Sequence, residues 1–439
     1  MTAEREARTT AERKARAARD ASLDMARLDA EVRDGALEDV ASEIERRADE
    51  ILEANRRDVD EAEELLESGE YTQALVDRLK LTESKVEGIA EMVRGVASQP
   101  DPVGATEWAR ELDDGLTLYR VSVPLGVVGS VFESRPDALP QIASLALKSG
   151  NAVVLKGGSE ASASNRALHD AVVEATDGVP EGWIQLVEER EEVDRLLELH
   201  GLVDLLMPRG SSEFVRYVQD NTHIPVLGHT EGVCHVYVDR DADLAEAVDV
   251  CLDAKLDYPA ACNAVETVLV HDDVAAEFLP DVVERLEDED VEVRGDEATR
   301  DHVDVAEAAN EDWRREYGDL VVSVAVVGSL DEAVDHVNTY GSKHTDAVLT
   351  EDGDRARWFM EAVDSASVFH NASTRFADGY RYGLGAEVGI STGKTHARGP
   401  VGVEGLTTYK YYLEGDGHVT GEYRSGESEF THRDVDLTW

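Results

Sequence analysis

The sequence has little lysine, little cysteine and few prolines. Lysine supplies only nine of the 43 basic residues, which face 94 acidic residues and leave a formal net charge of −51. The acidic residues are spread along the whole chain, and such a surface repels nucleic acids and anionic membranes. It suits a protein that stays soluble in concentrated salt, because screening then removes most of the self-repulsion. We therefore expect a halophilic protein with no nucleic-acid or membrane partner.

Long apolar runs and paired cysteines are also absent. No stretch approaches the roughly 18 to 20 apolar residues that cross a membrane, and the charged N-terminal stretch lacks the apolar core of a secretory signal. Three scattered cysteines, Cys234, Cys251 and Cys262, are too few for a disulfide framework or a zinc site. We therefore expect a protein of the reducing cytoplasm.

What the sequence does contain is material for a large core and a regular alternation of elements. With 439 residues and a hydrophobic fraction of 42%, it predicts two or three globular domains. The apolar spacing predicts helices over about residues 1–98, strands over about 105–130, and then alternating helices and strands. A second alternating run begins near residue 234, so we expect two doubly wound α/β domains with a boundary near residue 230. The cleft between them is the default location of an active site.

Two familiar nucleotide-binding motifs are missing, but a third arrangement is present. "GISTGKT" at 389–395 resembles a P-loop, yet its glycines enclose three residues where the loop needs four, and no G-x-G-x-x-G occurs. In "VVLKGGSEAS" at 153–162, an apolar strand ends in Lys156, and two glycines lead into a helix whose N-terminus attracts phosphate. "MPRGSSEFV" at 207–215 repeats the arrangement, which favours a nucleotide pocket over two plain glycine turns.

Cys262 differs from the other two cysteines. Cys251 lies within an amphipathic helix and Cys234 opens a strand, so both are expected in the core. Cys262 follows Pro259 and two alanines, which leave space beside the sulfur, and it precedes the strand "VETVLVH". It has two interpretations: packing, the commoner role of a free cysteine, and a nucleophile.

Basic residues gather in one late segment. In a chain that otherwise avoids cations, Lys394, His396, Arg398 and Lys410 lie within "GISTGKTHARGPVGVEGLTTYK". Such a cluster indicates a nearby anionic substrate group, and the alternative is a surface ion-pair network.

Four longer stretches carry a resemblance to a known family. They are "PLGVVGSVFESRPDALPQIASLALKSGNAVVLKGGSEASASN", "DYPAACNAVETVLVH", "NASTRFADG" and "GLGAEVGISTGKTHARGPVGVEGLTTYKY". Up to about residue 415, the chain resembles the gamma-glutamyl phosphate reductases of the aldehyde dehydrogenase superfamily. Residues 415–439 match no part of that family closely.

The resemblance implies a fold and a reaction. The expected α/β fold, aldehyde dehydrogenase-like, has a cofactor-binding domain over 1–232 with a β-arm segment at about 106–122. A catalytic domain follows over 233–400, and a return segment, oligomerisation arm and tail occupy 401–439. The implied reaction is the NADPH-dependent reduction of L-glutamyl 5-phosphate to L-glutamate 5-semialdehyde, with release of phosphate, in proline biosynthesis. It implies NADP or NADPH as cofactor, a cytoplasmic homo-oligomer (dimer or tetramer) and glutamate 5-kinase as a candidate partner.

The resemblance also assigns roles to residues. Cys262 stands at the position of the nucleophile, and Lys156 at the position that holds the adenosine ribose. Ser159 stands where NAD-preferring relatives carry a glutamate, which favours NADP. The residues expected to bind the cofactor are Lys156, Gly157, Ser159, Gly210, Ser211 and Glu316. The residues expected to bind the substrate are Arg135, Asn263, His396 and Arg398, since arginine matches phosphate and carboxylate.

One expected residue is missing. Hydrolytic relatives carry a glutamate that activates water, and the same spacing here falls on Gly228, with Glu231 nearby. A reductase that acts on an acyl phosphate has to protect its thioester from water, so the absence fits the implied reaction. The rivals are an aldehyde dehydrogenase that releases a free acid and a non-catalytic scaffold with an inert Cys262.

Overall fold

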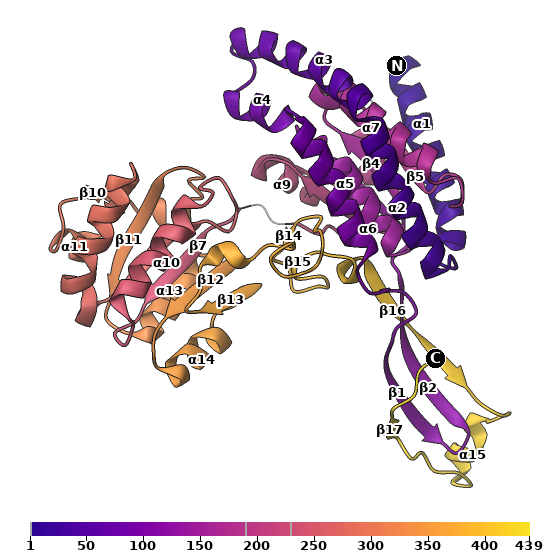
Figure 1. The fold of residues 1–439 in the computed structure, drawn as a ribbon. Helices are drawn as coiled ribbons and strands as arrows, with labels where there is room; N and C mark the ends of the chain where they lie inside the picture. Colours follow the sequence, from indigo (N-terminus) through magenta and orange to yellow (C-terminus); the bar gives the residue numbers. More distant parts are fainter. Residues whose placement is uncertain (1, 189–190, 229–230) are drawn as a thin grey trace.

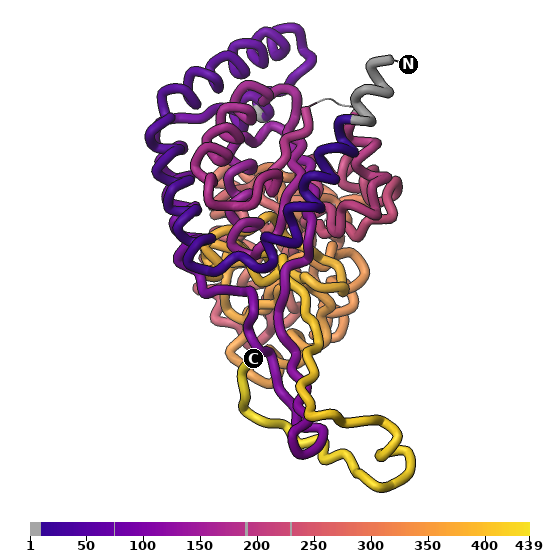
Figure 2. The backbone as a smooth tube through the Cα atoms, turned by 90° about the vertical axis from the view of Figure 1, so that its right-hand side faces the viewer, coloured from indigo at the N-terminus to yellow at the C-terminus, as the bar shows by residue number. Residues whose placement is uncertain are grey.

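The chain folds into two α/β lobes and a long β-arm (Figure 1). The computed structural model describes residues 2–188, 191–228 and 231–439, and the side chains of 10–73, 75–188, 192–228 and 231–439. Figure 2 shows the arm projecting away from the lobes, with the C-terminus beside it. The N-terminus lies at the other end of the N-terminal lobe.

The N-terminal lobe is a parallel sheet covered by helices. Its strands run in the order β5-β4-β3-β6. They are β3 (Val127–Phe132), β4 (Ala152–Gly157), β5 (Ile184–Val187) and β6 (Leu205–Arg209). The helices are α1 (Thr2–Met25), α2 (Ala30–Arg46), α3 (Ala48–Glu67), α4 (Gln73–Leu79), α5 (Glu83–Ala97), α6 (Ala138–Lys148), α7 (Ser162–Ala175), α8 (Glu191–Glu198) and α9 (Ser212–Asp220).

Apolar spacing and capping explain why these elements form. In α5, Val86, Ile89 and Val93 recur every three or four positions and are all buried, and the helix packs against α2 and α6. The helix begins after Thr82, whose hydroxyl accepts a hydrogen bond from the backbone N–H of Lys85 at 3.2 Å. Strands β3 and β4 are buried at every residue, as expected where helices cover both faces of a sheet.

The second lobe contains a wider parallel sheet with the strand order β10-β9-β11-β8-β7-β12-β13. Its strands are β7 (Cys234–Val238), β8 (Val265–His271), β9 (Glu292–Gly295), β10 (Ala306–Glu307), β11 (Val321–Val327), β12 (Thr345–Leu349) and β13 (Ser367–His370). Its helices are α10 (Leu244–Leu256), α11 (Asp272–Asp288), α12 (Glu297–Arg300), α13 (Leu330–Tyr340) and α14 (Gly353–Ala362). The first strand, β7, therefore lies inside the sheet, where the order of the strands reverses.

The chain then returns to the N-terminal lobe. Ala386, Val388 and Ala397 belong to the hydrophobic core of that lobe. A short hairpin, which lies between the lobes in Figure 1, begins just after Val388 and has Ala397 in its connecting loop. Its strands are β14 (Ile390–Ser391) and β15 (Gly399–Pro400). The return segment thus links the two lobes at the place where they face each other.

The arm is an antiparallel sheet with the strand order β16-β2-β1-β17. Its elements are β1 (Thr106–Asp113), β2 (Leu116–Pro124), β16 (Thr407–Glu414), α15 (Thr420–Ser425) and β17 (Arg433–Val435). The tail after β16 supplies β17, which pairs with β1, and Trp439, whose ring lies 4.6 Å from that of Tyr412. Residues 415–439, which were not matched closely to the family from the sequence, therefore complete one edge of the arm.

The predicted α/β fold with two parallel sheets is confirmed, with one difference. The sequence predicts a strand at "IPVLG", but the structure has there only one isolated bridge, between Leu206 and Val226. Pro225 accepts a hydrogen bond from Leu206 but has no N–H to donate, so the ladder does not extend.

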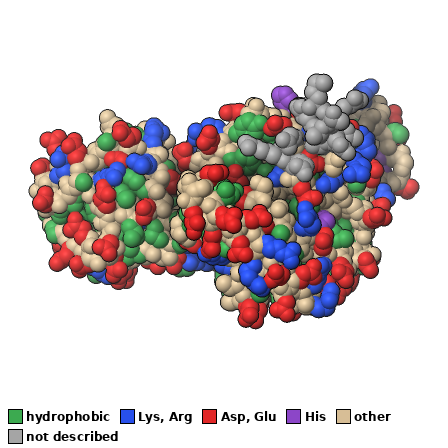
Figure 3. All heavy atoms as spheres, turned by 90° about the horizontal axis from the view of Figure 1, so that it is seen from above, with side chains coloured by type: hydrophobic (Ala, Val, Ile, Leu, Met, Phe, Trp, Pro, Cys, Tyr) green, Lys and Arg blue, Asp and Glu red, His purple; other side chains and the backbone are tan. Residues whose placement is uncertain are grey.

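The surface agrees with the composition. Acidic side chains are spread over both lobes on the face seen in Figure 3. Within the described part of the chain, no helix is both long enough and apolar enough to cross a bilayer.

Candidate active site

A cavity of about 1370 Å³ lies where the two lobes and the return segment meet. The N-terminal lobe contributes residues that follow β3 (Glu133, Ser134, Arg135) and β6 (Gly210, Ser211). The second lobe contributes the turn around Cys262, together with Glu316 and Arg375. The return segment contributes Ala386 to Ile390. Six separate parts of the sequence therefore converge on one space.

Cys262 sits in a tight turn between α10 and β8, at the amino end of the second sheet. The turn is held by backbone hydrogen bonds from Ala261 to Tyr258 (3.0 Å) and from Ala264 to Ala261 (2.9 Å). Cys262 is half-buried and lines the cavity, whereas Cys234 and Cys251 are buried in the core, as predicted. This placement favours the nucleophile over packing.

The backbone beside Cys262 leaves no room for a side chain. A Cβ atom added to Gly232 would lie 1.9 Å from the carbonyl oxygen of Cys262, so only glycine fits this crossing. The same carbonyl accepts a hydrogen bond from the thiol of Cys234, with a sulfur–oxygen distance of 3.3 Å. Cys234 therefore helps to hold the turn that presents Cys262.

Burial and nearby carboxyl groups keep the Cys262 sulfur protonated. Burial, together with the carboxyl groups of Glu387 and Glu316, raises the pKa of Cys262 to about 12, against the opposing effect of Arg209. A thiol with such a pKa is a weak nucleophile until a base accepts its proton.

Glu387 has the properties of that base. Burial raises the pKa of Glu387 to about 7, against the effect of Arg209. The carboxylate accepts a hydrogen bond from the backbone N–H of Gly379 at 2.9 Å, and the residue lines the cavity. The sequence prediction missed Glu387. Its signal was an acid within the apolar, glycine-rich stretch "GLGAEVGI", a setting in which a carboxyl group is expected to be buried.

Arg135 and Arg209 bring positive charge to the same cavity. A guanidinium nitrogen of Arg209 (Nη1) donates to the Gln141 side-chain oxygen at 3.0 Å and to the backbone carbonyl of Glu387 at 3.5 Å. Burial lowers the pKa of Arg209, and the Arg135 guanidinium lowers it further. Arg135 was predicted from the sequence, but Arg209 was not, although it ends the strand in "MPRG".

The predicted cofactor residues fall into two groups. Gly210, Ser211 and Glu316 line the cavity. Lys156, Gly157 and Ser159 lie outside its lining: Lys156 is buried and donates to the carbonyl of Gly157, and Ser159 is exposed. Gly210 and Ser211 follow the carboxyl end of β6, and Lys156, Gly157 and Ser159 lie at the carboxyl end of β4, with β3 between these two strands. Glu316 precedes β11 of the second sheet.

The predicted substrate residues are also divided. Asn263 lines the cavity, but its amide is engaged: it donates to the carbonyl of Ala377 at 2.9 Å and accepts from Arg375. Neither His396 nor Arg398 appears in the lining.

The late basic segment forms an ion-pair network instead of a site. Arg398 and Lys394 lie 3.1 and 2.9 Å from the carboxylate of Asp364, which also binds Lys343 at 3.2 Å. Lys394 and its neighbours lower the pKa of Asp364 to about 2. Lys410 lies on strand β16 of the arm. The structure therefore matches the alternative interpretation of this cluster for Lys394 and Arg398.

The position of the water-activating glutamate holds no described carboxyl group. Gly228 lines the cavity, as its expected place requires. Glu231 does not appear in the lining and pairs with Arg216 at 3.1 Å. His229 and Thr230 lie outside the described residues.

Known proteins of one family are similar to this chain over most of its length. The family model described as "Aldehyde dehydrogenase family" matches residues 1–312. The gamma-glutamyl phosphate reductase of Natronomonas pharaonis is 63% identical over 433 residues, 98% of this chain and 99% of that protein. The enzyme of the same name from Haloquadratum walsbyi is 61% identical over 98% of this chain and 96% of that protein.

A solved structure has a closely similar fold. The crystal structure of gamma-glutamyl phosphate reductase from Thermotoga maritima superposes with a TM-score of 0.90 at 41% identity, covering 93% of this chain and 99% of that one. The chain belongs to the aldehyde dehydrogenase family and, within it, to the gamma-glutamyl phosphate reductases.

Proposed function

We propose that this oxidoreductase carries out the NADPH-dependent reduction of L-glutamyl 5-phosphate to L-glutamate 5-semialdehyde, in proline biosynthesis, through a thioester on Cys262. The observation that carries the proposal is the position of Cys262: it faces an interlobe cavity in which no described carboxyl group occupies the place of the hydrolytic base. The names of the relatives supply the substrate.

Formation of the thioester begins with the transfer of a proton. Glu387, with a pKa of about 7, is half ionised near neutral pH and is the candidate acceptor of the Cys262 proton. The thiolate then attacks the acyl carbon and phosphate leaves. A backbone hydrogen bond from the N–H of Cys262 favours the thiolate. Because phosphate is a good leaving group, the acid–base demand falls on the thiol.

Asn263 has a positioning role in this proposal. Its bonds to Arg375 and to the carbonyl of Ala377 tie the turn of Cys262 to the segment Ser373–Ala377. Arg375 is fixed in turn by Asp257 at 3.1 Å. The amide is therefore better suited to aligning the nucleophile than to contacting the substrate.

The residues at the sheet edge of the N-terminal lobe fit NADPH. Close packing requires glycine at 157 and 210: a Cβ at Gly157 would lie 2.1 Å from the Asn165 amide, and one at Gly210 would lie 2.4 Å from the Glu133 carboxylate. Glu160, the acid nearest to Ser159, turns away from the exposed position and accepts from the Ser134 backbone at 2.6 Å. Lys156, Ser159 and Ser211 would then hold the nucleotide. Bound there, NADPH supplies the hydride that reduces the thioester.

Arg135, His396 and Arg398 are proposed to bind the substrate, and the structure supports them to different degrees. Arg135 lines the cavity and is a direct candidate for an anionic group of the substrate. Arg398 is engaged by Asp364, and His396 does not appear in the cavity lining, so a role for either requires a rearrangement on binding. A cytoplasmic homo-oligomer that receives its labile substrate from glutamate 5-kinase completes the proposal. The edge strand β16 exposes Tyr409 and Tyr411 for such assembly.

The test is the reverse reaction in concentrated salt. L-Glutamate 5-semialdehyde, inorganic phosphate and NADP are mixed with wild type and with Cys262→Ser, and absorbance at 340 nm is followed. We expect phosphate-dependent formation of NADPH that falls by about 10³-fold or more in the variant. Cys251→Ser, at a buried cysteine of helix α10, is the matched control and should retain turnover. Steady turnover without phosphate would indicate hydrolysis, and an equally active Cys262→Ser would exclude the thioester.

A further inference from the structure

Two arginines that line the cavity of Cys262 form no ion pair. Within the described part of the chain, neither Arg135 nor Arg209 pairs with an acidic side chain, although the formal net charge is −51. By contrast, Arg375 and Arg381 both bind Asp257, at 3.1 and 2.9 Å. A guanidinium group that faces a cavity without an acidic partner is available to an anionic ligand.

Arg209 is held in place by neutral groups. It ends strand β6, opposite Phe132 at the end of β3. Its Nη1 bonds to Gln141 and to a backbone carbonyl, and its Nε and Nη2 make no hydrogen bond to a described residue. The residue is half-buried, and a charge partly withdrawn from water is costly unless an opposite charge joins it. The side chain is therefore fixed but only partly satisfied.

The two guanidinium groups act on each other and on Cys262. Arg135 lowers the pKa of Arg209, which shows that the positive charges repel. The Cys262 sulfur, Glu387 and Asp137 act in the opposite direction. None of these groups forms an ion pair with Arg209, and all of them line the same cavity as the two arginines.

We infer that Arg209 and Arg135 together bind the phosphate of the acyl phosphate, with Arg209 as the residue that holds it beside Cys262. The inference rests on the proposed function and extends it to a residue that the sequence did not indicate. Two planar forks match a phosphate group better than one, and an arriving dianion relieves the repulsion between them.

The chemistry at this site balances without a further reactant. The bond between the Cys262 sulfur and the acyl carbon forms, and the bond between that carbon and the phosphate oxygen breaks. The electron pair of the broken bond stays on the phosphate, and the proton released by the thiol ends there by way of Glu387. In the reverse direction, Arg209 and Arg135 position inorganic phosphate to attack the thioester.

The test separates the phosphate step from the thioester step. Wild type, Arg209→Ala and Arg209→Lys are assayed in the reverse direction with varied inorganic phosphate. We expect the KM for phosphate to rise about 10- to 100-fold in Arg209→Ala, with the KM for the aldehyde unchanged. Arg209→Lys should recover part of the loss, because lysine keeps the charge but not the fork. Arg285→Gln removes one exposed, Asp249-paired charge and is the control for the loss of charge as such.

A second measurement uses the same variants without phosphate. Mixing enzyme, aldehyde and NADP should give a stoichiometric burst of NADPH in wild type and in Arg209→Ala alike, because the thioester forms without phosphate. The burst also shows that the variant is folded. An unchanged KM for phosphate, a raised KM for the aldehyde alone, or loss of the burst in Arg209→Ala would each overturn the inference. Absence of phosphate-dependent turnover in wild type would instead contradict the proposed function.

Discussion

The carboxyl edges of the two parallel sheets differ: one lines the cavity and the other is filled by polar side chains of the protein. In the N-terminal lobe, the residues after β3 and β6 open into the cavity, and Arg209 there has donors without partners. In the second lobe, the corresponding edge is filled by the protein's own polar groups. Parallel α/β sheets generally bind ligands at the carboxyl ends of their strands, and in the described part of this chain the carboxyl edge of the N-terminal sheet lines the cavity.

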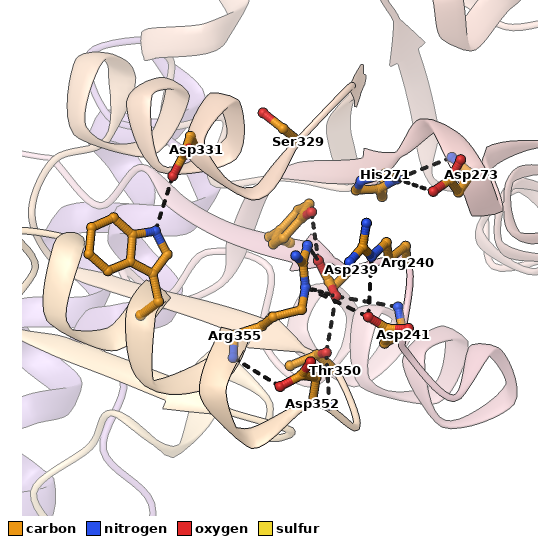
Figure 4. A network of polar contacts seen from close by, with 12 residues as sticks. Asp239, Arg240, Asp241, His271, Asp273, Ser329, Asp331, Thr350, Asp352 and Arg355 are labelled. Carbon is orange, nitrogen blue, oxygen red and sulfur yellow. Dashed lines mark hydrogen bonds and ion pairs between the residues drawn. The ribbon is translucent and has the colours of Figure 1, made fainter.

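The filled edge is centred on Asp239, at the end of β7 (Figure 4). Its carboxylate accepts from Arg355 at 2.7 Å, from the hydroxyl of Tyr237 at 2.9 Å and from Thr350 at 3.1 Å. Burial alone would raise the pKa of Asp239, but these hydrogen bonds lower it below its usual value. All acceptor positions are used, so no ligand is needed to satisfy this buried charge.

Cys262 belongs to the other edge of the second sheet. It precedes β8 and therefore lies at the amino end of the strands, where that sheet faces the carboxyl edge of the N-terminal lobe. The comparison shows that a cluster of charged residues at a sheet edge becomes a candidate site when the protein leaves some of its donors unpaired. Substitutions at Asp239, in the filled edge, test this difference between the two sheets.

Asp239→Asn should give the largest loss of stability. It leaves Arg355 without its buried partner, and such changes cost about 3 kcal/mol or more of the free energy of unfolding. Denaturant unfolding in concentrated salt measures the loss. Asp241→Asn is the matched control: that carboxylate is about half exposed and lies 3.8 Å from Arg355, so we expect about 1 kcal/mol or less.

The folded fraction of Asp239→Asn should keep wild-type turnover. A variant that is stable but inactive would mean that the filled edge is itself a functional site, and the contrast between the two sheets would disappear.

Glu387→Gln tests whether Glu387, in the cavity, accepts the proton of Cys262. The wild-type rate of thioester formation should rise with pH through about 7 and then level, because only the ionised carboxylate accepts the thiol proton. The variant should be about 10²- to 10³-fold slower at pH 7 and should lose this limb. Stopped-flow measurement of the NADPH burst across pH provides the readout. An unchanged pH profile in Glu387→Gln would show that another group activates Cys262.

Asp364→Asn should have the smallest effect. Its three cations lie on the surface, so we expect a loss of about 1 kcal/mol or less, shrinking as salt is added. Because the pKa of Asp364 is depressed to about 2, its contribution is present above the unfolded value near 3.8 and is lost as pH falls towards 2. Thermal melts at several pH values and salt concentrations test this. A large loss of turnover would indicate that the late basic segment belongs to the active site.

The sequence predicted the parts that depend on neighbouring residues. Periodicity placed the strands of the first sheet and the first two strands of the second sheet, and the small residues before Cys262 indicated an accessible sulfur. It did not predict Arg209 and Glu387, because their roles depend on contacts between segments far apart in the chain. Arg209 bonds Gln141 and the carbonyl of Glu387. Lys394 and Arg398 looked free to bind a substrate because their partner, Asp364, lies outside the segment in which they cluster. Salt adaptation stays a prediction.

The most direct measurement is the intact mass of the protein after mixing with L-glutamate 5-semialdehyde and NADP in the absence of phosphate. The account predicts a stoichiometric glutamyl adduct on wild type, none on Cys262→Ser, and its discharge when inorganic phosphate is added. An adduct that decays in water as fast as in phosphate, or that forms equally on the serine variant, would contradict the claim that Cys262 carries a thioester protected for transfer to phosphate.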